Sequence, residues 1–305
     1  MSEIICKSGK KLLTIPNDVF INTNLKKLYM RSNKIQTIPK DIGLLLNLVI
    51  LELSRNEISE LPKEIGLLVN LVELVLSDNV INSLPKEIGL LNSLEELNLS
   101  GNIISNISDE LLNLHNLKYL NLSRNLLQDK DISILCKLPV EKLLLGDNGI
   151  TSLPNEMINM KNLKEIGLHE NKFTEFPKIL CLMPKLVIIG LRDNKITNIP
   201  YEIENLILLE EFYLDSNNIK TIPIQITKLD KLKYLWIKNN MITNASEFLD
   251  NLYKMTDLSE LFLNGNPLEN IVEENIVTGE NMNIMSLGNG IMGSNGVLHK
   301  NINIL

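Results

Sequence analysis

The sequence is poor in the residues from which covalent, metal and redox centres are built. It has 3 cysteines, 3 histidines and 1 tryptophan among 305 residues. Cys6, Cys136 and Cys181 are too few for a disulfide framework, and none belongs to a C-x-x-C pair or accompanies a histidine cluster. These absences argue against a disulfide-stabilised domain and a structural zinc site. We therefore expect reduced thiols, no metal and no cofactor.

An excess of basic charge and a long apolar run are also lacking. The formal net charge is −7, which disfavours a nucleic-acid-binding protein. No run of about 18 consecutive apolar residues is present, so we expect no membrane insertion. Residues 1–13 lack the apolar core of a secretory signal peptide. Together these absences predict a soluble cytoplasmic protein, and we expect a monomer.

Catalytic signatures are missing too. The residues near the end spell G-x-G-x-x-G at Gly288, Gly290 and Gly293, but no acidic residue follows about 20 positions later, as a dinucleotide-binding fingerprint requires. His169 lies two repeat units from the nearest candidate nucleophile, Ser123, beyond the hydrogen-bond reach that a nucleophile and its base need. An enzyme would need a pair of such groups that the sequence does not offer. We expect no catalytic residue and no small-molecule substrate.

The sequence does contain a regular repeat. An asparagine recurs every 23 residues from Asn33 to Asn240, and an eleventh, Asn266, follows after a slightly longer interval. If each unit starts eight residues before its asparagine, positions 1, 4, 6 and 11 are apolar in all eleven units. One unit is Leu48 to Asn70, LVILELSRNEISELPKEIGLLVN. Such strict self-similarity predicts a repeat architecture.

Elementary geometry gives each position of the unit a role. Apolar positions 4 and 6 alternate with positions 3, 5 and 7, as in a short strand with one buried face. One unit cannot bury its leucines alone, so the units should stack, with parallel strands about 4.8 Å apart. The asparagine carries both a donor and an acceptor and can satisfy backbone groups of the turn that follows.

The pattern L-x-x-L-x-L-x-x-N-x-L, matched over residues 25–268, resembles the leucine-rich-repeat family. The resemblance implies an α/β fold: a right-handed solenoid with a concave parallel β-sheet and mostly short convex segments. The segments L/I-P-x-E/D-I-G around Ile42, Ile65 and Ile88 are similar to those of the intracellular, 23-residue Ras-group leucine-rich-repeat scaffolds. In that group the concave face binds signalling proteins.

The chain divides into a cap, repeats and a tail. We interpret residues 1–24 as an N-terminal cap and degraded first repeat, 25–268 as eleven repeats, 269–277 as a C-terminal cap and 278–305 as a disordered tail. The alternative is that isoleucines and leucines of the tail cover the open end of the solenoid. Proline after the apolar residue in most units predicts extended or single-turn convex segments. In the tenth repeat, which starts at Leu232, inserted residues predict a convex helix of two to three turns. In the fifth repeat, which starts at Leu117, we expect a shorter helix.

The outward strand positions are rich in aromatic residues. Positions 3 and 5 hold six of the thirteen aromatics: Tyr29, Tyr119, Tyr213, Tyr234, Trp236 and Phe262. Core packing cannot explain this, because these positions face away from the leucines. Tyr213, Trp236 and Phe262 share position 5 of successive units and predict an exposed aromatic strip for protein binding. The alternative is that aromatic residues simply suit strands.

Charged residues surround this strip. The predicted partner-binding residues are Tyr213, Tyr234, Trp236, Phe262, Glu211, Asp215, Arg192 and His169, the last expected to be an exposed histidine. A second acidic patch is expected at Glu73, Asp78, Glu95 and Glu96. Such faces would steer a partner with a largely basic surface, and the alternative is ordinary solvated charge.

We therefore expect a non-enzymatic intracellular scaffold that binds one or more partner proteins on its concave face, in signalling. A regulatory subunit of a type-one protein phosphatase is the alternative, because some leucine-rich intracellular proteins bind that enzyme through aromatic and acidic concave residues. Those subunits usually lack the Leu-Pro segment seen here.

Overall fold

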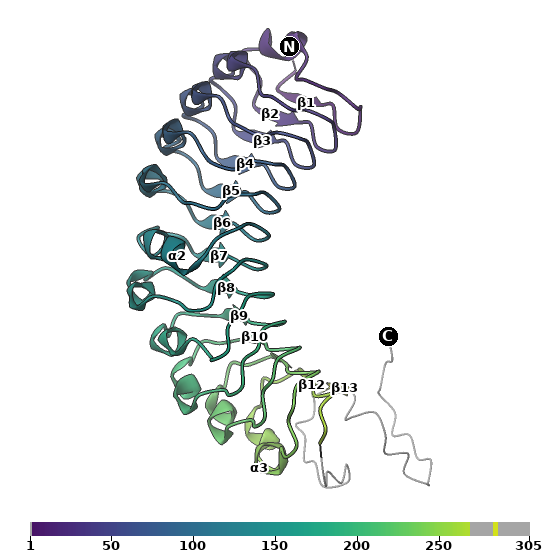
Figure 1. Ribbon diagram of the computed structural model, residues 1–305, viewed down its shortest axis with the longest axis vertical. Helices are drawn as coiled ribbons and strands as arrows, with labels where there is room; N and C mark the ends of the chain where they lie inside the picture. Colours follow the sequence, from purple (N-terminus) through teal and green to yellow (C-terminus); the bar gives the residue numbers. More distant parts are fainter. Residues whose placement is uncertain (1, 269–282, 286–305) are drawn as a thin grey trace. The chain divides into compact units, whose positions relative to one another are not determined.

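The computed structural model describes residues 2–268 and 283–285, and the chain divides into two compact units, residues 1–163 and 164–305. Each unit is a series of coils, and most coils contribute one short strand and one short helix on the opposite side (Figure 1). The strands of a unit lie side by side, so the coils form the stacked layers of a solenoid.

The first unit contains strands that pair in sequence order, each parallel to the next. These strands are β1 (Ile4–Cys6), β2 (Lys27–Tyr29), β3 (Ile50–Glu52), β4 (Glu73–Val75), β5 (Glu96–Asn98), β6 (Tyr119–Asn121) and β7 (Lys142–Leu144). Its helices are α1 (Asn17–Phe20), η1 (Lys40–Leu44), η2 (Lys63–Leu67), η3 (Lys86–Leu90), η4 (Asp109–Asn113), α2 (Asp129–Leu135) and η5 (Asn155–Asn159).

The second unit repeats the arrangement, again with parallel neighbours. Its strands are β8 (Glu165–Gly167), β9 (Ile188–Gly190), β10 (Glu211–Tyr213), β11 (Tyr234–Trp236), β12 (Glu260–Phe262) and β13 (Asn283–Met285). Its helices are η6 (Lys178–Leu182), η7 (Tyr201–Asn205), η8 (Ile224–Lys228), α3 (Ser246–Leu249) and η9 (Leu252–Lys254).

The register of the strands follows the sequence repeat. Leu28 pairs with Leu51, and Leu51 with Leu74, so each step between partners equals one repeat unit. Strands β2 to β12 occupy positions 3 to 5 of the eleven units, so the expected strand positions and parallel order are confirmed. The step from Leu235 to Leu261 is longer because unit ten carries inserted residues, and pairing still continues in register.

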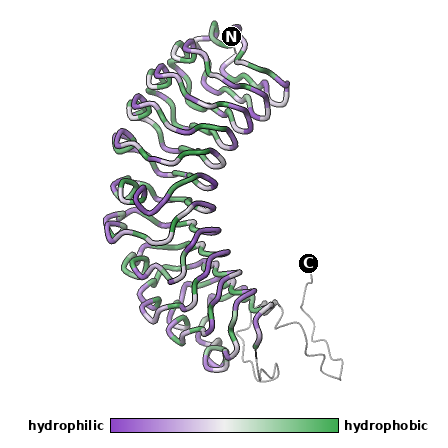
Figure 2. Tube along the Cα trace, in the orientation of Figure 1, coloured by the Kyte–Doolittle hydropathy of each residue, from purple (hydrophilic) through white to green (hydrophobic). Residues whose placement is uncertain are grey.

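The core consists of the predicted apolar columns. In the unit that starts at Leu48, the side chains of Leu48, Leu51, Leu53 and Ile58 are all 0% exposed. Full burial of such a side chain stabilises the fold by about 1.5–3 kcal/mol, so these columns supply most of the driving force. Figure 2 shows hydrophobic and hydrophilic residues alternating along every coil.

The repeated asparagine ties neighbouring coils together. Asn102 Nδ2 donates to the carbonyl of Leu99 in its own coil at 2.9 Å and to that of Leu76 in the preceding coil at 3.0 Å. Its Oδ1 accepts the N–H of Ile81 at 2.9 Å. The same pattern recurs, for example, at Asn56, Asn125, Asn217 and Asn240. The expected role of the asparagine in satisfying turn backbone is confirmed.

Most helices are single 3₁₀ turns that begin after a proline. The prolines before η1 to η3 and η5 to η8 have φ between −61° and −74°, the range that the ring imposes. Gly89 of η3 lets the next coil approach closely, because a Cβ there would lie 2.5 Å from the carbonyl oxygen of Glu110. The expectation of short segments opposite the sheet is confirmed.

The helix expected in unit five is present, but the helix in unit ten is shorter than expected, so the expected order of the two lengths was wrong. Helix α2 of unit five has seven residues, and Gln128 N–H donates to Asp131 Oδ2 at 2.9 Å, which caps its first turn. Helix α3 of unit ten has only four. Asn251 Nδ2 donates to the carbonyl of Glu247 at 2.8 Å, while Asn251 N–H turns to Phe248. A side chain thus takes the acceptor of the next α-helical bond and ends the helix.

The end of the chain is described only in part. The backbone of β13 pairs in parallel with β12, with Asn283 opposite Glu260. The other residues of the predicted C-terminal cap and tail, 269–282 and 286–305, lie outside the described part of the chain. The interpretation of residues 278–305 therefore stays a prediction.

Candidate protein-interaction surface

The outward side of the sheet, here called the strand face, presents positions 3 and 5 of each coil. In strands β10 to β12 the register places Glu211 beside Tyr234 and Tyr234 beside Glu260. It also places Tyr213 beside Trp236 and Trp236 beside Phe262. The strands therefore gather the four predicted aromatic residues into one group, here called the aromatic patch: Tyr213, Tyr234, Trp236 and Phe262.

Three rings of the aromatic patch pack on one another. The ring centroids of Tyr213 and Trp236 are 4.9 Å apart at an interplanar angle of 72°, and those of Trp236 and Phe262 are 5.1 Å apart at 78°. Edge-to-face pairs of this kind stabilise by about 0.5–1.5 kcal/mol beyond area burial. Because the rings cover one another, these side chains are half-buried rather than exposed as the sequence predicted.

The polar atoms of these rings are bonded to carboxylates. Tyr213 Oη donates to Glu211 Oε2 at 2.5 Å, and Trp236 Nε1 donates to Glu260 Oε2 at 3.3 Å. Burial and this bond to Glu211 raise the pKa of Tyr213. The hydroxyl therefore stays protonated and holds the Glu211 carboxylate beside the ring. The Glu260 carboxylate is likewise held beside the Trp236 ring by the bond from the indole N–H, a contact that the strand register alone did not reveal.

Asp215 lies in a different environment from the one expected. Its residue exposure is only 4%, so it is not part of an accessible acidic rim. Its Oδ1 accepts the backbone N–H of Lys238 at 3.1 Å. Burial raises the pKa of the carboxyl, and the nearby Lys238 partly opposes that effect. Asp215 therefore joins the turns after β10 and β11. Lys238 Nζ lies 5.9 Å from the centroid of the Trp236 ring.

Arg192 and His169 lie beside the patch rather than within it. Arg192 follows β9, is exposed, and its Nε is 3.8 Å from Asp193 Oδ2. His169 follows β8, is half-buried rather than fully exposed, and belongs to the second coil before β10. The coil order therefore sets a histidine and an arginine on the side of the patch nearest β9.

The strand face is open at Gly190, next to Tyr213 in the register. A Cβ built on Gly190 would have nothing closer than Gly167 Cα at 3.8 Å, an ordinary contact distance. The strand face therefore has room for a side-chain atom at Gly190. Gly167 itself is buried.

In the first compact part of the chain, residues 1–163, the strand face carries charged side chains instead of a group of aromatic ones. Lys118 Nζ is 2.7 Å from Glu95 Oε2, and Arg124 Nη1 is 3.0 Å from Asp78 Oδ1. Two members of the expected acidic patch are therefore neutralised by basic neighbours. Partial burial, followed by repulsion from Glu96 and Glu52, raises the pKa of Glu73.

The three cysteines lie in two different environments. Cys6 is exposed, whereas Cys136 and Cys181 are buried. Burial raises the pKa of Cys136 to about 11 and that of Cys181 to about 12. Both thiols are therefore protonated near neutral pH and pack as small apolar groups.

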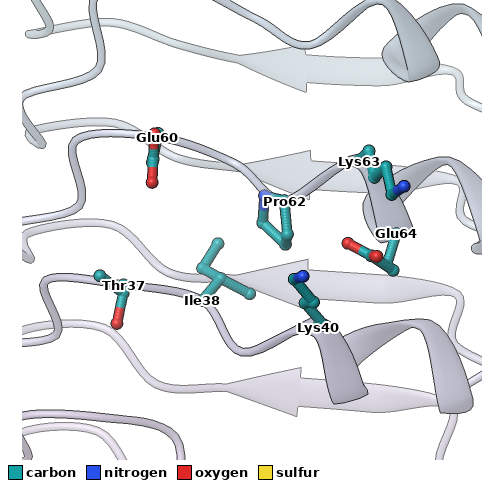
Figure 3. Close-up of a pocket in the computed structure, with 7 residues that line it drawn as sticks. All are labelled: Thr37, Ile38, Lys40, Glu60, Pro62, Lys63 and Glu64. Carbon is teal, nitrogen blue, oxygen red and sulfur yellow. The ribbon is translucent and has the colours of Figure 1, made fainter.

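One hollow lies away from the strand face, where the chain enters η1 and η2 (Figure 3). Its volume is about 290 Å³, and its lining residues are Thr37, Ile38, Lys40, Glu60, Pro62, Lys63 and Glu64. The lining holds no cysteine, serine or histidine that a base could activate. Within residues 2–268 and 283–285, no three His, Cys, Asp or Glu side chains gather as metal ligands. No helix in the same residues is long and apolar enough to cross a membrane.

Comparisons with known proteins agree with this architecture. The family model for a leucine-rich repeat region matches residues 17–143. An internalin from Listeria monocytogenes is 25% identical, with 93% of this chain and 82% of that chain covered at a TM-score of 0.77. A leucine-rich-repeat protein from Leptospira interrogans is 26% identical, with 92% and 95% covered at a TM-score of 0.61. No curated protein matches the chain.

A third structure adds a complex. The ectodomain of the Arabidopsis thaliana membrane receptor kinase GASSHO1/SCHENGEN3, solved in complex with CASPARIAN STRIP INTEGRITY FACTOR 2, is 30% identical with a TM-score of 0.70. The match covers 90% of this chain and 34% of that chain. Repeat register, asparagine bonds and these likenesses lead to one conclusion: the chain is a leucine-rich-repeat protein. Proteins of this family commonly mediate protein–protein interaction and are generally not enzymes.

Proposed function

We propose that the chain is a non-enzymatic scaffold that binds a partner protein on the strand face of β10 to β12, the predicted concave face. One observation carries the proposal: Tyr213, Trp236 and Phe262 pack in a row on the outward side of the sheet. Half-buried aromatic groups outside the core are typical binding hot spots. Polar groups around them, including Glu211 and Glu260, supply the rim of such a site.

The finer parts of the proposal concern setting and pathway. We place the protein in the cytoplasm, as a monomer acting in signalling, because its sequence resembles the Ras-group leucine-rich-repeat scaffolds. The two free buried thiols, Cys136 and Cys181, support a reducing compartment. We expect no nucleic acid, membrane lipid or small molecule as partner.

Trp236→Ala tests the proposal. Partners are captured from a lysate of the source organism with the wild-type chain, and their affinities for both chains are measured by titration calorimetry. Trp236→Ala should lower the affinity by at least about 2 kcal/mol, as expected for an aromatic hot spot. Glu73→Ala, on β4, is the control and should change it by less than about 1 kcal/mol. Equal, small effects of both substitutions would place the binding site elsewhere.

The identity of the captured proteins separates two versions of the function. Small GTPases or kinases would support the signalling scaffold. A type-one phosphatase catalytic subunit would support the alternative, a regulatory subunit, which the aromatic patch beside Glu210, Glu211 and Glu260 favours. The Leu-Pro segments before η2 and η3 favour the scaffold.

A further inference from the structure

Two carboxylates that border the aromatic patch, those of Glu211 and Glu260, form no ion pair with any of the described residues. Glu210 lies 2.6 Å from Lys233 Nζ. In contrast, no nitrogen of a lysine, arginine or histidine among residues 2–268 lies within 4.0 Å of the carboxylate of Glu211 or Glu260. Each of these two carboxylates uses one oxygen to accept a bond from a ring of the patch. Each keeps acceptor capacity for a further donor.

The register sets the two carboxylates on either side of one ring. Glu211, Tyr234 and Glu260 are partners across β10, β11 and β12. Adjacent strands are about 4.8 Å apart, so the backbones that carry the two glutamates are roughly 10 Å apart. Tyr234 lies between them, and the Tyr213, Trp236 and Phe262 rings lie one pleat along the strands. A flat cation placed over these rings would have a carboxylate on each side.

The wider surface also favours a cationic partner. Accessible acidic residues outnumber basic ones around β9 to β12: Asp193, Glu210, Glu211 and Glu260 against Arg192, Lys233 and Lys238. The Trp236 ring already has Lys238 Nζ at 5.9 Å, so this ring lies within range of a cation. An apolar partner would bury two carboxylates without a counter-charge, which is unfavourable.

We propose that the aromatic patch recognises an arginine side chain in a basic segment of the partner, stacked on the rings between Glu211 and Glu260. This inference rests on the proposed function, because it names the chemistry of the partner at the same surface. Arginine fits better than lysine for two reasons. Its planar guanidinium stacks on aromatic rings, and its fork of N–H groups serves two carboxylates at once.

Short random peptides displayed on phage are the first probe. Selection on the immobilised full chain should enrich arginine at one position, and synthetic peptides from the selected family are then measured by fluorescence anisotropy. Replacing that arginine by citrulline, which keeps the shape and removes the charge, should weaken binding at least about tenfold, equivalent to about 1.4 kcal/mol. Replacement by lysine should weaken it several-fold. A selected family without enriched arginine, or no selected family, overturns the inference.

The matched variants act on the protein side. The double variant Glu211→Gln, Glu260→Gln should lose at least about tenfold in affinity for the arginine peptide and should lose most of its salt dependence. The control, Glu73→Gln with Glu96→Gln, changes the same residue type at the same position of the repeat. It should alter affinity less than about twofold. Thermal unfolding of each variant checks that the fold is intact.

The outcomes separate the inference from the function beneath it. If Trp236→Ala abolishes peptide binding and the Gln pair does not, the surface binds protein but the arginine inference is wrong. If Trp236→Ala binds the selected peptides as tightly as wild type, the proposed function at this surface fails and the inference fails with it. Loss of binding in both, with the control unchanged, supports both.

Discussion

The strand faces of β4 to β6 and β10 to β12 share one backbone plan and differ almost entirely in side chains. On β4 to β6, Glu73 and Glu96 lie side by side, and the neighbouring Glu95 is paired with Lys118. On β10 to β12, rings pack on rings, and among residues 2–268 no lysine, arginine or histidine nitrogen lies within 4.0 Å of the Glu211 or Glu260 carboxylate. The first face pairs Glu95 and Asp78 with basic side chains, whereas the second combines its carboxylates with packed aromatic rings.

The difference shows where this repeat can change. Positions 1, 4, 6 and 11 and the asparagine make the coil, and in both regions these four positions are apolar and the asparagine is kept. Positions 3 and 5 point away from the leucine core, so they can hold glutamate in one coil and tryptophan in another. Function is therefore carried by side chains added to a constant scaffold.

The largest expected effect tests whether the scaffold is the same in both regions. Asn102→Ala and Asn217→Ala should each lower the free energy of unfolding by about 3 kcal/mol, because several buried backbone groups lose a partner at once. Urea unfolding measures it. Asn116, whose exposed Nδ2 donates to Asn92 O at 2.7 Å, is the control, and its alanine variant should lose less than about 0.5 kcal/mol. A loss below about 0.3 kcal/mol at both buried sites would contradict the bonding described here.

The next effect contrasts two glycines. Gly89→Ala should destabilise by about 1–2 kcal/mol, because its Cβ would lie 2.5 Å from a backbone oxygen of the next coil. Gly190→Ala should be almost neutral, because its nearest neighbour would be 3.8 Å away. Thermal unfolding of both variants makes the comparison. If Gly190→Ala were the more damaging, the strand face at Gly190 would not be open.

A smaller effect separates binding from folding at the aromatic patch. Trp236→Ala should lower the free energy of unfolding by about 1 kcal/mol, because the ring packs edge to face with two neighbours. Tyr119→Ala on β6 should lower the free energy of unfolding less, because the Tyr119 ring is near a cation, Lys142 Nζ at 5.6 Å from the ring centroid, instead of two packed rings. Urea unfolding of both variants is the measurement. A loss above about 3 kcal/mol would make Trp236 a core residue by the usual range for such truncations.

The smallest effect concerns pH on the acidic face. The pKa of Glu73 is raised in the folded protein by partial burial and by Glu96 and Glu52. The native state then binds more protons than the unfolded state just above the ordinary carboxyl pKa, so this group's contribution falls as pH rises through that window. Glu73→Gln should flatten this fall and add no more than about 0.5 kcal/mol near neutral pH. The free energy of unfolding is measured across the acidic pH range. A steeper fall with pH in Glu73→Gln than in the wild type would contradict a raised pKa of Glu73.

Periodicity made the architecture predictable. Strands at positions 3 to 5, the apolar columns and the bonds of the asparagines follow from a repeat of constant length, because each unit must bury its leucines against the next. The same register predicts that Tyr213, Trp236 and Phe262 lie in one row. The aromatic patch was therefore predictable as a group of neighbours.

The details set by side-chain reach were not predictable. Asp215 was expected on an exposed rim but bonds inward to Lys238 N–H. Asp78 was expected to add negative charge but is paired with Arg124. Helix α3 stops early because Asn251 bonds back to Glu247. Each outcome depends on which of several partners a flexible polar side chain selects, and a spacing pattern does not encode that choice.

The asparagine of unit eleven shows how this chain tolerates a change of length. Asn266 Nδ2 reaches the carbonyl of Ile237, 29 positions back, where the other coils span 26. The inserted residues leave the bond intact because they lie in the segment of α3 and η9, opposite the strands. The side of the coil opposite the strands should therefore tolerate further inserted residues, including an engineered tag, without a change in strand register.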